Sequence, residues 1–226
     1  MKKYFTLKNI SAIAIFSAVA VILACVPGLQ FSLPFFPSFL QLHFDEIPIL
    51  ISTFAYGPFV GTFILIIKSL IKLPMDFGSN LGIGVLADFL YTFSLIFPAG
   101  LIYKKFHSIK GALLALGVGG ICELFMSSVL GLYIIYPLYG LVYTEEAVIG
   151  MFKVVPSLSN MTSLTDPRVI YTVLIPFNLI KIAIVLFVTF IIYKPIRFLI
   201  DFERKKKNTP KVKKDEEITN NNLNNK

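Results

Sequence analysis

Apolar residues fill most of this chain in long runs, separated by short stretches rich in charge, proline or glycine. Six such runs can be recognised, at about 10–27, 45–56, 58–73, 83–103, 111–136 and 169–193. A helix needs about 20 apolar residues to cross a bilayer, so the longer runs are predicted to be transmembrane helices. The second and third runs are shorter, and the turn Tyr56-Gly57-Pro58 divides them. Short spans of this kind are typical of segments that are buried in protein or line a cavity.

The composition agrees with a membrane protein. Hydrophobic residues make up 56% of the chain, the mean hydropathy is +0.77, and 15% of residues are charged, compared with about 25% in soluble domains. We therefore predict an all-α membrane protein with one six-helix membrane domain at 1–200. Residues 201–226 are rich in Lys, Asn and acidic residues, which predicts a disordered tail. The net charge of +8 comes mostly from the chain ends, so it does not indicate nucleic-acid binding.

The distribution of basic residues predicts the topology. These residues cluster at the N-terminus, at 104–110 and at 194–214. The positive-inside rule places all three clusters in the cytoplasm, which requires an even number of spans between them. Six spans with both termini cytoplasmic meet this requirement. A five-span alternative brings Lys68 and Lys72 inside but sends the basic tail outside. In the six-span arrangement, Lys68 must face an outward-open pocket or snorkel along its stem.

Six spans place three connections outside. The connection at 28–43 is apolar yet punctuated by proline, which predicts a semi-rigid lid over a pocket. The alternative is a re-entrant or interfacial segment anchored by its Phe side chains. The connection at 74–82 is predicted to be a short loop. The connection at 138–168 is longer and more polar, and it is expected to be a solvated loop without a binding role.

Lys181 lies in the middle of the last apolar run, in the stretch Pro176-Phe177-Asn178-Leu179-Ile180-Lys181. Pro176 interrupts the helical hydrogen bonds there, and Asn178 adds an amide. A charge at that depth costs about 2.5–3.5 kcal/mol on insertion scales. The cost favours an interior polar site over a lipid-facing surface. Lys181 is therefore predicted to contact a ligand, with Asn178 beside it. The alternative is a structural ion pair with Asp88 or Glu123.

Other chemistry is not readable in the sequence. The stretch from Gly61 to Lys68-Ser69 lacks the glycine that precedes the lysine of a phosphate-binding loop. His43 and His107 are far apart, so no metal site is predicted. No catalytic Ser-His-Asp or Cys-His set can be recognised. We therefore expect a protein without enzymatic activity, cofactor or metal.

Several short motifs resemble a known family when their order and spacing are taken together. They are FPSFLQLHFDEIPIL at 36–50, Gly-Pro-x-x-Gly at 57–61 followed by Lys68, Pro-Ala-x-x-Ile-Tyr-Lys at 98–104, Pro-Leu-Tyr at 137–139 and Pro-Phe-Asn-x-x-Lys at 176–181. The chain resembles the substrate-binding S component of energy-coupling factor (ECF) vitamin transporters, and most closely the riboflavin-specific branch. The likeness extends over roughly 30–194.

The resemblance implies a multi-pass protein of the bacterial plasma membrane that binds riboflavin from outside. It also implies a membrane scaffold subunit and two cytoplasmic ATPases as partners, so that the chain needs no ATPase of its own. The ligand-binding residues that it implies are Lys181, Asn178, Asp88, Lys68, Phe39, Leu40 and Glu46. In this family, small residues four apart on the first helix contact the scaffold, and Ala14 and Ala18 fit that spacing. Ala20 and Ala24 repeat it, and the alternative for these alanines is packing within the chain.

Three positions depart from the family pattern. Val85 stands where the family has Glu, Asp88 where it has Asn, and Gly131 where an Asn that reads the flavin ring is expected. The alternative ligands are therefore a related flavin or another planar vitamin. A membrane protein with a structural buried ion pair is the alternative from a different class.

Overall fold

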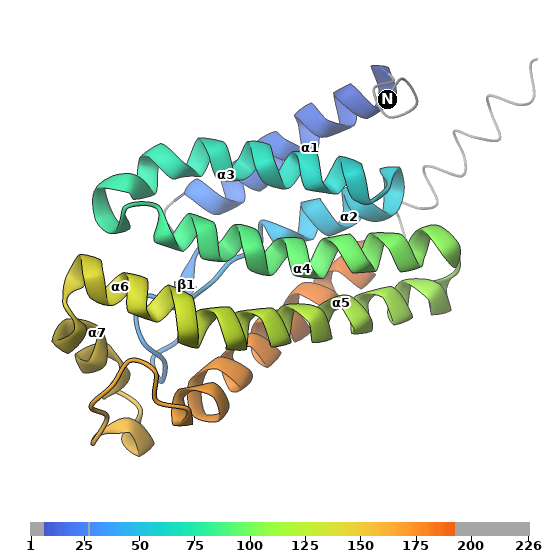
Figure 1. Cartoon of the computed structure of the whole chain (residues 1–226). Helices are drawn as coiled ribbons and strands as arrows, with labels where there is room; N and C mark the ends of the chain where they lie inside the picture. The colour runs from blue at the N-terminus through green and yellow to red at the C-terminus, as the bar shows by residue number, and fades with distance from the viewer. Residues whose placement is uncertain (1–6, 27, 193–226) are drawn as a thin grey trace, which may run out of the picture. The chain divides into compact units, whose positions relative to one another are not determined.

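The computed structural model describes residues 7–26 and 28–192. The first five helices are α1 (Leu7–Cys25), α2 (Glu46–Tyr56), α3 (Pro58–Asn80), α4 (Ile83–Lys105) and α5 (Ile109–Leu130) (Figure 1). Helix α4 packs against both α3 and α5, and α1 packs against α2 and α3. The chain divides into two compact units after Thr189, and the packing described below lies within the first unit. The predicted tail at 201–226 and the basic cluster at 194–214 lie outside the described residues.

Two helices contain a π-helical turn. Helix α5 continues through the π turn Gly131–Ile135 into α6 (Tyr136–Tyr143), and the whole element runs from Ile109 to Tyr143. The last helix, Ile170–Ile192, opens with the π turn Ile170–Leu174. Between these two elements lie α7 (Glu145–Phe152) and the 3-10 turn Pro156–Leu158. Single π turns of this kind occur frequently at functional sites.

The apolar runs do form helices. Four helices of the described residues are long and apolar enough to cross a membrane, namely Pro58–Asn80, Ile83–Lys105, Ile109–Tyr143 and Ile170–Ile192. The apolar helices Asn9–Cys25 and Glu46–Tyr56 are shorter. The mostly helical fold agrees with an all-α membrane protein. Six crossings and cytoplasmic termini stay predictions.

The turn between α2 and α3 has the form that its sequence predicts. Gly57 adopts a φ of 103°, which glycine tolerates because it has no Cβ. Pro58 follows at the first position of α3, where a proline removes no helical hydrogen bond.

Two predicted loops are wrong. The connection at 74–82 is helical as far as Asn80, with Pro74 inside α3, and the chain turns at Leu81 and Gly82, which both have positive φ. A proline in a helix interior costs about 3 kcal/mol. Helix α3 bears that cost because it packs along α1 and α4.

The connection at 138–168 is not a solvated loop. Helix α6 extends to Tyr143, and α7 turns an apolar face inward through Val148, Ile149 and Phe152. Leu158 and Met161 are buried with them. The acidic start of α7 at Glu145 hid this helical spacing in the sequence.

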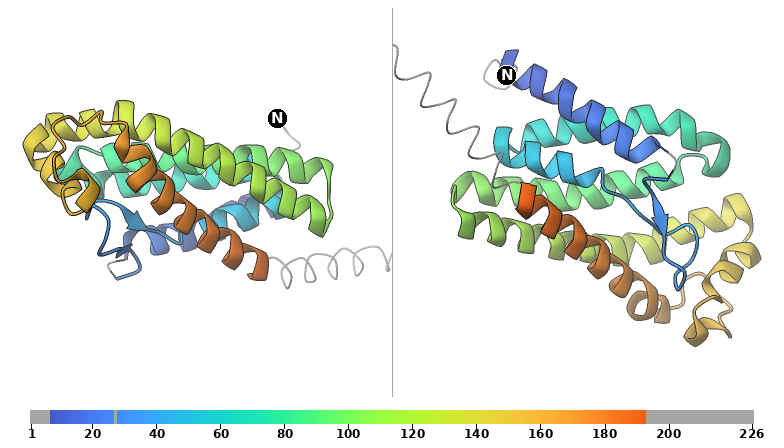
Figure 2. Two further views of the ribbon diagram at one scale, coloured as in Figure 1. Left: turned by 90° about the horizontal axis from the view of Figure 1, so that it is seen from below. Right: turned by 180° about the vertical axis from the view of Figure 1, so that it is seen from behind.

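The connection at 28–43 contains a small ribbon. Strand β1 (Phe31–Ser32) pairs antiparallel with β2 (Gln41–Leu42), with Phe31 opposite Leu42 and Ser32 opposite Gln41. Figures 1 and 2 show this blue segment beside the start of the last helix, near α6 and α7. Ring contacts support this placement, because Phe36 lies 5.4 Å from Phe177 and Phe39 lies 5.5 Å from Phe152 between centroids. We call residues 28–43 the lid segment.

Candidate functional site

A cavity of about 500 Å³ lies between the lid segment, α3, α4, α6, α7 and the last helix. Ligand sites commonly enclose about 300–1,000 Å³, so this space can hold a small organic molecule. Of the predicted site residues, Lys181, Asn178, Asp88, Phe39 and Leu40 line it. Lys68 and Glu46 do not belong to the lining, and both are fully buried behind it.

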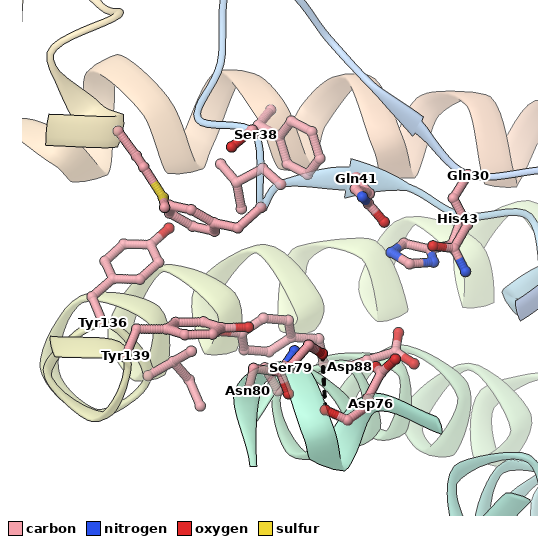
Figure 3. A pocket seen from close by; sticks show the side chains of 18 of the residues that line it. Gln30, Ser38, Gln41, His43, Asp76, Ser79, Asn80, Asp88, Tyr136 and Tyr139 are labelled. Atoms are coloured by element: carbon pink, nitrogen blue, oxygen red, sulfur yellow. Dashed lines mark hydrogen bonds between the residues drawn. The ribbon is translucent and has the colours of Figure 1, made fainter. Parts of the chain in front are cut away.

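One end of the cavity is aromatic. Phe39 of the lid segment lies 5.6 Å from both Tyr136 and Tyr139, measured between ring centroids. Figure 3 shows Tyr136 and Tyr139 together at this end, with Ser38 of the lid segment above them. These rings offer flat, apolar faces of the kind that pack against planar ligands.

The other end of the cavity is polar. Figure 3 shows Gln30, Gln41 and His43 of the lid segment facing the helices that carry Asp76 and Asp88. Amide and neutral imidazole groups both donate and accept hydrogen bonds, and carboxylates accept them. The cavity therefore has an apolar, aromatic part and a hydrogen-bonding part.

His43 lies between β2 and α2, outside the helices. Its side chain is 17% exposed, and Nδ1 lies 3.9 Å from Oδ1 of Asp45. Burial lowers the pKa of His43 below its ordinary value of 6.5, although Asp45 opposes this shift. The imidazole is thereby kept neutral at the rim of the cavity.

Lys181 lines the cavity and also forms a buried ion pair, the alternative that the sequence left open. Its Nζ lies 2.5 Å from Oε1 of Glu46 and 2.9 Å from Oε1 of Glu123. Glu123 was one of the two expected partners, whereas Asp88 is paired elsewhere. An ammonium has three N–H donors, so two carboxylates leave one donor for a ligand.

Lys68 forms the second buried ion cluster. It is fully buried, and its ammonium contacts the carboxylates of both Asp45 and Asp88. Two carboxylate partners explain how an intramembrane lysine is accommodated at this position of α3. Lys68 acts on the cavity through Asp88, which lines it.

Adjacent residues at the start of α2 join the two clusters. Asp45 contacts Lys68, and Glu46 contacts Lys181 while accepting a hydrogen bond from Thr92 Oγ1 at 3.0 Å. The positive end of the helix dipole favours carboxylates at this terminus. Asp45 and Glu123 were not predicted as site residues. The available signal was the pair of acids directly before a buried apolar helix, together with Glu123 in an apolar run.

Asn178 is fixed by its own helix. Its Nδ2 donates to the carbonyl oxygen of Leu174 at 2.8 Å, at the end of the π turn Ile170–Leu174. This bond directs the amide and leaves Oδ1 as an acceptor at the cavity wall.

The two alanine pairs of α1 differ in exposure. Ala14 and Ala18 are exposed, whereas Ala20 and Ala24 are fully buried. The first pair is therefore available on the surface of this chain, and the second pair packs within it. Across 7–26 and 28–192, no group of three or more His, Cys, Asp or Glu side chains is placed to hold a metal ion.

The fold and the cavity define a multi-helix membrane protein with an internal space large enough for a small ligand. The family model of the ECF transporter substrate-specific component matches residues 8–193. The chain belongs to this family, whose members are transport components rather than enzymes.

The similar proteins include riboflavin transporters. RibU of Staphylococcus aureus (strain TCH60) is 28% identical over 187 residues, which cover 83% of this chain and 89% of that protein. FmnP of Bacillus subtilis (strain 168) is 28% identical over 193 residues, covering 83% and 93%. RibU of Lactococcus lactis subsp. cremoris (strain MG1363) is 31% identical over 176 residues, covering 76% and 84%.

A solved structure also resembles this fold. It is described as "Structure and mechanism of the S component of a bacterial ECF transporter", with a TM-score of 0.64 and 27% identity, covering 85% of this chain and 97% of that one.

Proposed function

We propose that this chain is the riboflavin-binding subunit of an ECF-type importer in the bacterial plasma membrane. The observation that carries the proposal is the two-part cavity, in a chain similar to three riboflavin transporters. Riboflavin has a planar, mostly apolar ring with polar atoms along one edge, and a ribityl chain of hydroxyl groups. The aromatic end suits the ring, and the polar end suits the hydroxyl groups.

The residues assigned to binding follow from the cavity lining. Lys181 and Asn178 present a donor and an acceptor, which suit the polar edge of the ring. Phe39 and Leu40 cover the ligand from the lid segment, and Asp88 borders it from α4. Glu46 and Lys68 position Lys181 and Asp88 through the two buried ion clusters.

The topology that fits this function has six membrane crossings and both termini in the cytoplasm. The lid segment then lies outside, where the vitamin arrives. In this topology the short α2 and the longer α3 cross the membrane in opposite directions, and the turn at Gly57 connects them.

Energy for uptake comes from partners in this proposal. A membrane scaffold subunit and two cytoplasmic ATPases drive transport, and the exposed Ala14 and Ala18 of α1 contact the scaffold. Small side chains let helices approach closely within a membrane.

A fluorescence titration tests the ligand. Riboflavin is added to detergent-purified protein, and packing of the ring against Tyr and Phe faces should quench flavin fluorescence in a saturable manner. Bound flavin should also give the purified protein a yellow colour. Absence of quenching at micromolar protein, with another planar vitamin binding instead, would contradict the riboflavin assignment and leave the family assignment intact.

A further inference from the structure

Tyr91 lies on the face of α4 that borders the cavity. Gly84, Ala87, Asp88 and Tyr91 all line it, and their spacing of three and four residues places them on one side of the helix. Lys181 lines the same cavity from the last helix. Tyr91 was not among the residues that the sequence indicated as a binding site.

The Tyr91 hydroxyl lies close to Gly131, which has no side chain. A Cβ atom added at Gly131 would lie 3.3 Å from Oη of Tyr91 and 3.4 Å from Cδ2 of Leu174. The hydroxyl therefore lies against the backbone at the start of the π turn Gly131–Ile135. Leu174, whose carbonyl orients Asn178, borders the same position 131. Any side chain at position 131 would crowd the hydroxyl, because contacts this short are tighter than most Cβ contacts in proteins.

The hydroxyl is not used within the protein. In the part of the chain that the structure describes, Tyr91 bonds through its backbone carbonyl, which accepts from Ser94 Oγ at 2.7 Å. The phenol oxygen of Tyr91 is not fully enclosed, whereas that of Tyr136 is buried without a hydrogen-bond partner. A polar group that borders a cavity in this way can bond to a ligand at little desolvation cost.

The polar groups that line the cavity together with Tyr91 match one edge of a flavin ring. That edge carries two carbonyl oxygens with an N–H between them. Lys181 has one free donor after pairing with Glu46 and Glu123, and Asn178 has a free acceptor after its bond to Leu174. A second donor is needed to complete the set, and the Tyr91 hydroxyl supplies it.

We infer that Tyr91 donates a hydrogen bond to the heteroatom edge of the flavin ring, and that Gly131 permits this by lacking a side chain. This inference rests on the proposed function. It makes Tyr91 a specificity-determining residue for the ring, whereas the polar end of the cavity takes the ribityl chain.

The first test compares two flavins. Lumiflavin carries the ring with a methyl group in place of the ribityl chain. Tyr91→Phe should weaken binding of riboflavin and of lumiflavin by the same factor, about 3- to 10-fold, as expected for one neutral hydrogen bond. Tyr133→Phe is the matched control, because Tyr133 is 58% exposed and should leave both affinities unchanged. Loss of riboflavin affinity alone would overturn the inference, since the hydroxyl would then read the ribityl chain.

The second test is a double-mutant cycle. Gly131→Ala should weaken riboflavin binding in the wild-type background and have little effect in the Tyr91→Phe background, because the crowded atom is then absent. Thermal midpoints of all variants are measured in the same series, so that a loss of affinity caused by unfolding is recognised. Additive effects would overturn the link between the two residues. If the wild-type protein binds no flavin, both the proposed function and this inference fail. If only the variants behave otherwise, the proposed function stands.

Discussion

Glu123 and Lys181 are separated by 58 positions in the sequence, yet Lys181 Nζ donates to Oε1 of Glu123 at 2.9 Å. The contact joins α5 to the last helix at the cavity wall. It makes the binding wall and the packing of two helices depend on the same ammonium group.

Variants of Lys181 and Glu123 should separate the effect on ligand binding from the effect on helix packing. Lys181→Met should weaken riboflavin binding by about 1 kcal/mol or more, and it should also lower the thermal midpoint, because Glu46 and Glu123 lose their partner. Adding Glu123→Gln should recover part of the stability without restoring affinity. Titration and thermal unfolding of the two variants measure both effects. Unchanged affinity in the folded single variant would indicate that Lys181 is a structural residue only.

Replacing Lys68 should affect stability more than ligand binding. Lys68→Met leaves Asp45 and Asp88 without their ammonium partner, and breaking a buried ion pair costs about 3–5 kcal/mol. The thermal midpoint should fall strongly, and Asp45→Asn in the same chain should recover part of it. Riboflavin affinity of the folded fraction should change less than with Lys181→Met, because Lys68 does not line the cavity. An equal or larger loss of affinity would place Lys68 in direct contact with the ligand.

The exposed alanines of α1 should matter for uptake alone. Ala14→Leu and Ala18→Leu should leave riboflavin binding intact in purified protein and reduce uptake in cells, because a larger side chain keeps the scaffold helix away. Ala20→Leu is the comparison variant for a buried position of the same helix. Ala20 is fully buried, so overpacking there should lower the thermal midpoint, whereas the Ala14 and Ala18 variants should not. Uptake at the wild-type rate with both exposed alanines replaced would contradict the docking role.

The lid segment should be required for tight binding. Deletion of 34–40 should abolish the quenching of riboflavin, and Phe39→Ala should weaken binding, because Phe39 contacts Tyr136 and Tyr139 at the aromatic end. Phe35→Ala is a suitable control, since Phe35 is 79% exposed. Equal effects of the two Phe variants would argue against a specific role of Phe39.

Acid should destabilise the protein through His43. Its folded-state pKa lies below 6.5, so the folded protein binds the proton less tightly than the unfolded chain. The contribution is complete above the unfolded pKa and is lost as the pH falls from there towards the folded pKa. Asp45 and Asp88 favour the charged imidazole, and Lys72 and Lys181 oppose it. Thermal midpoints between about pH 7.5 and 5.5 should therefore fall less for His43→Gln than for the wild type. Identical profiles would show that His43 does not titrate in this range.

The helices could be predicted from the sequence, but some of their ends could not. Apolar runs predicted each of the four long helices in the described part of the chain, because hydropathy reports burial and membrane insertion directly. Pro74 misled the prediction because proline favours a turn, and Glu145 did so because its charge interrupts the apolar pattern. Tertiary packing of α3 against α4, and of Phe152 in the core, overrides that local preference.

The site was predicted in part for a similar reason. Lys181 and Asn178 stand out as polar residues in an apolar run, and both line the cavity. Tyr91 gives no such signal, because a tyrosine in an apolar helix is common. The Tyr91 hydroxyl lies beside Gly131, which belongs to another helix. A contact between segments that are distant in the chain cannot be predicted from the local sequence.

The pairing of β1 with β2 has a consequence for how quickly a ligand can leave. Phe31 opposite Leu42 joins the two ends of the lid segment, which opposes opening of residues 33–40 by unravelling from one end. We expect them to swing outward as one flap while this pairing holds, with little chain entropy released. Escape is then resisted mainly by the enthalpy of separating Phe36 and Phe39 from their ring partners. The residence time of the ligand should therefore shorten steeply with rising temperature.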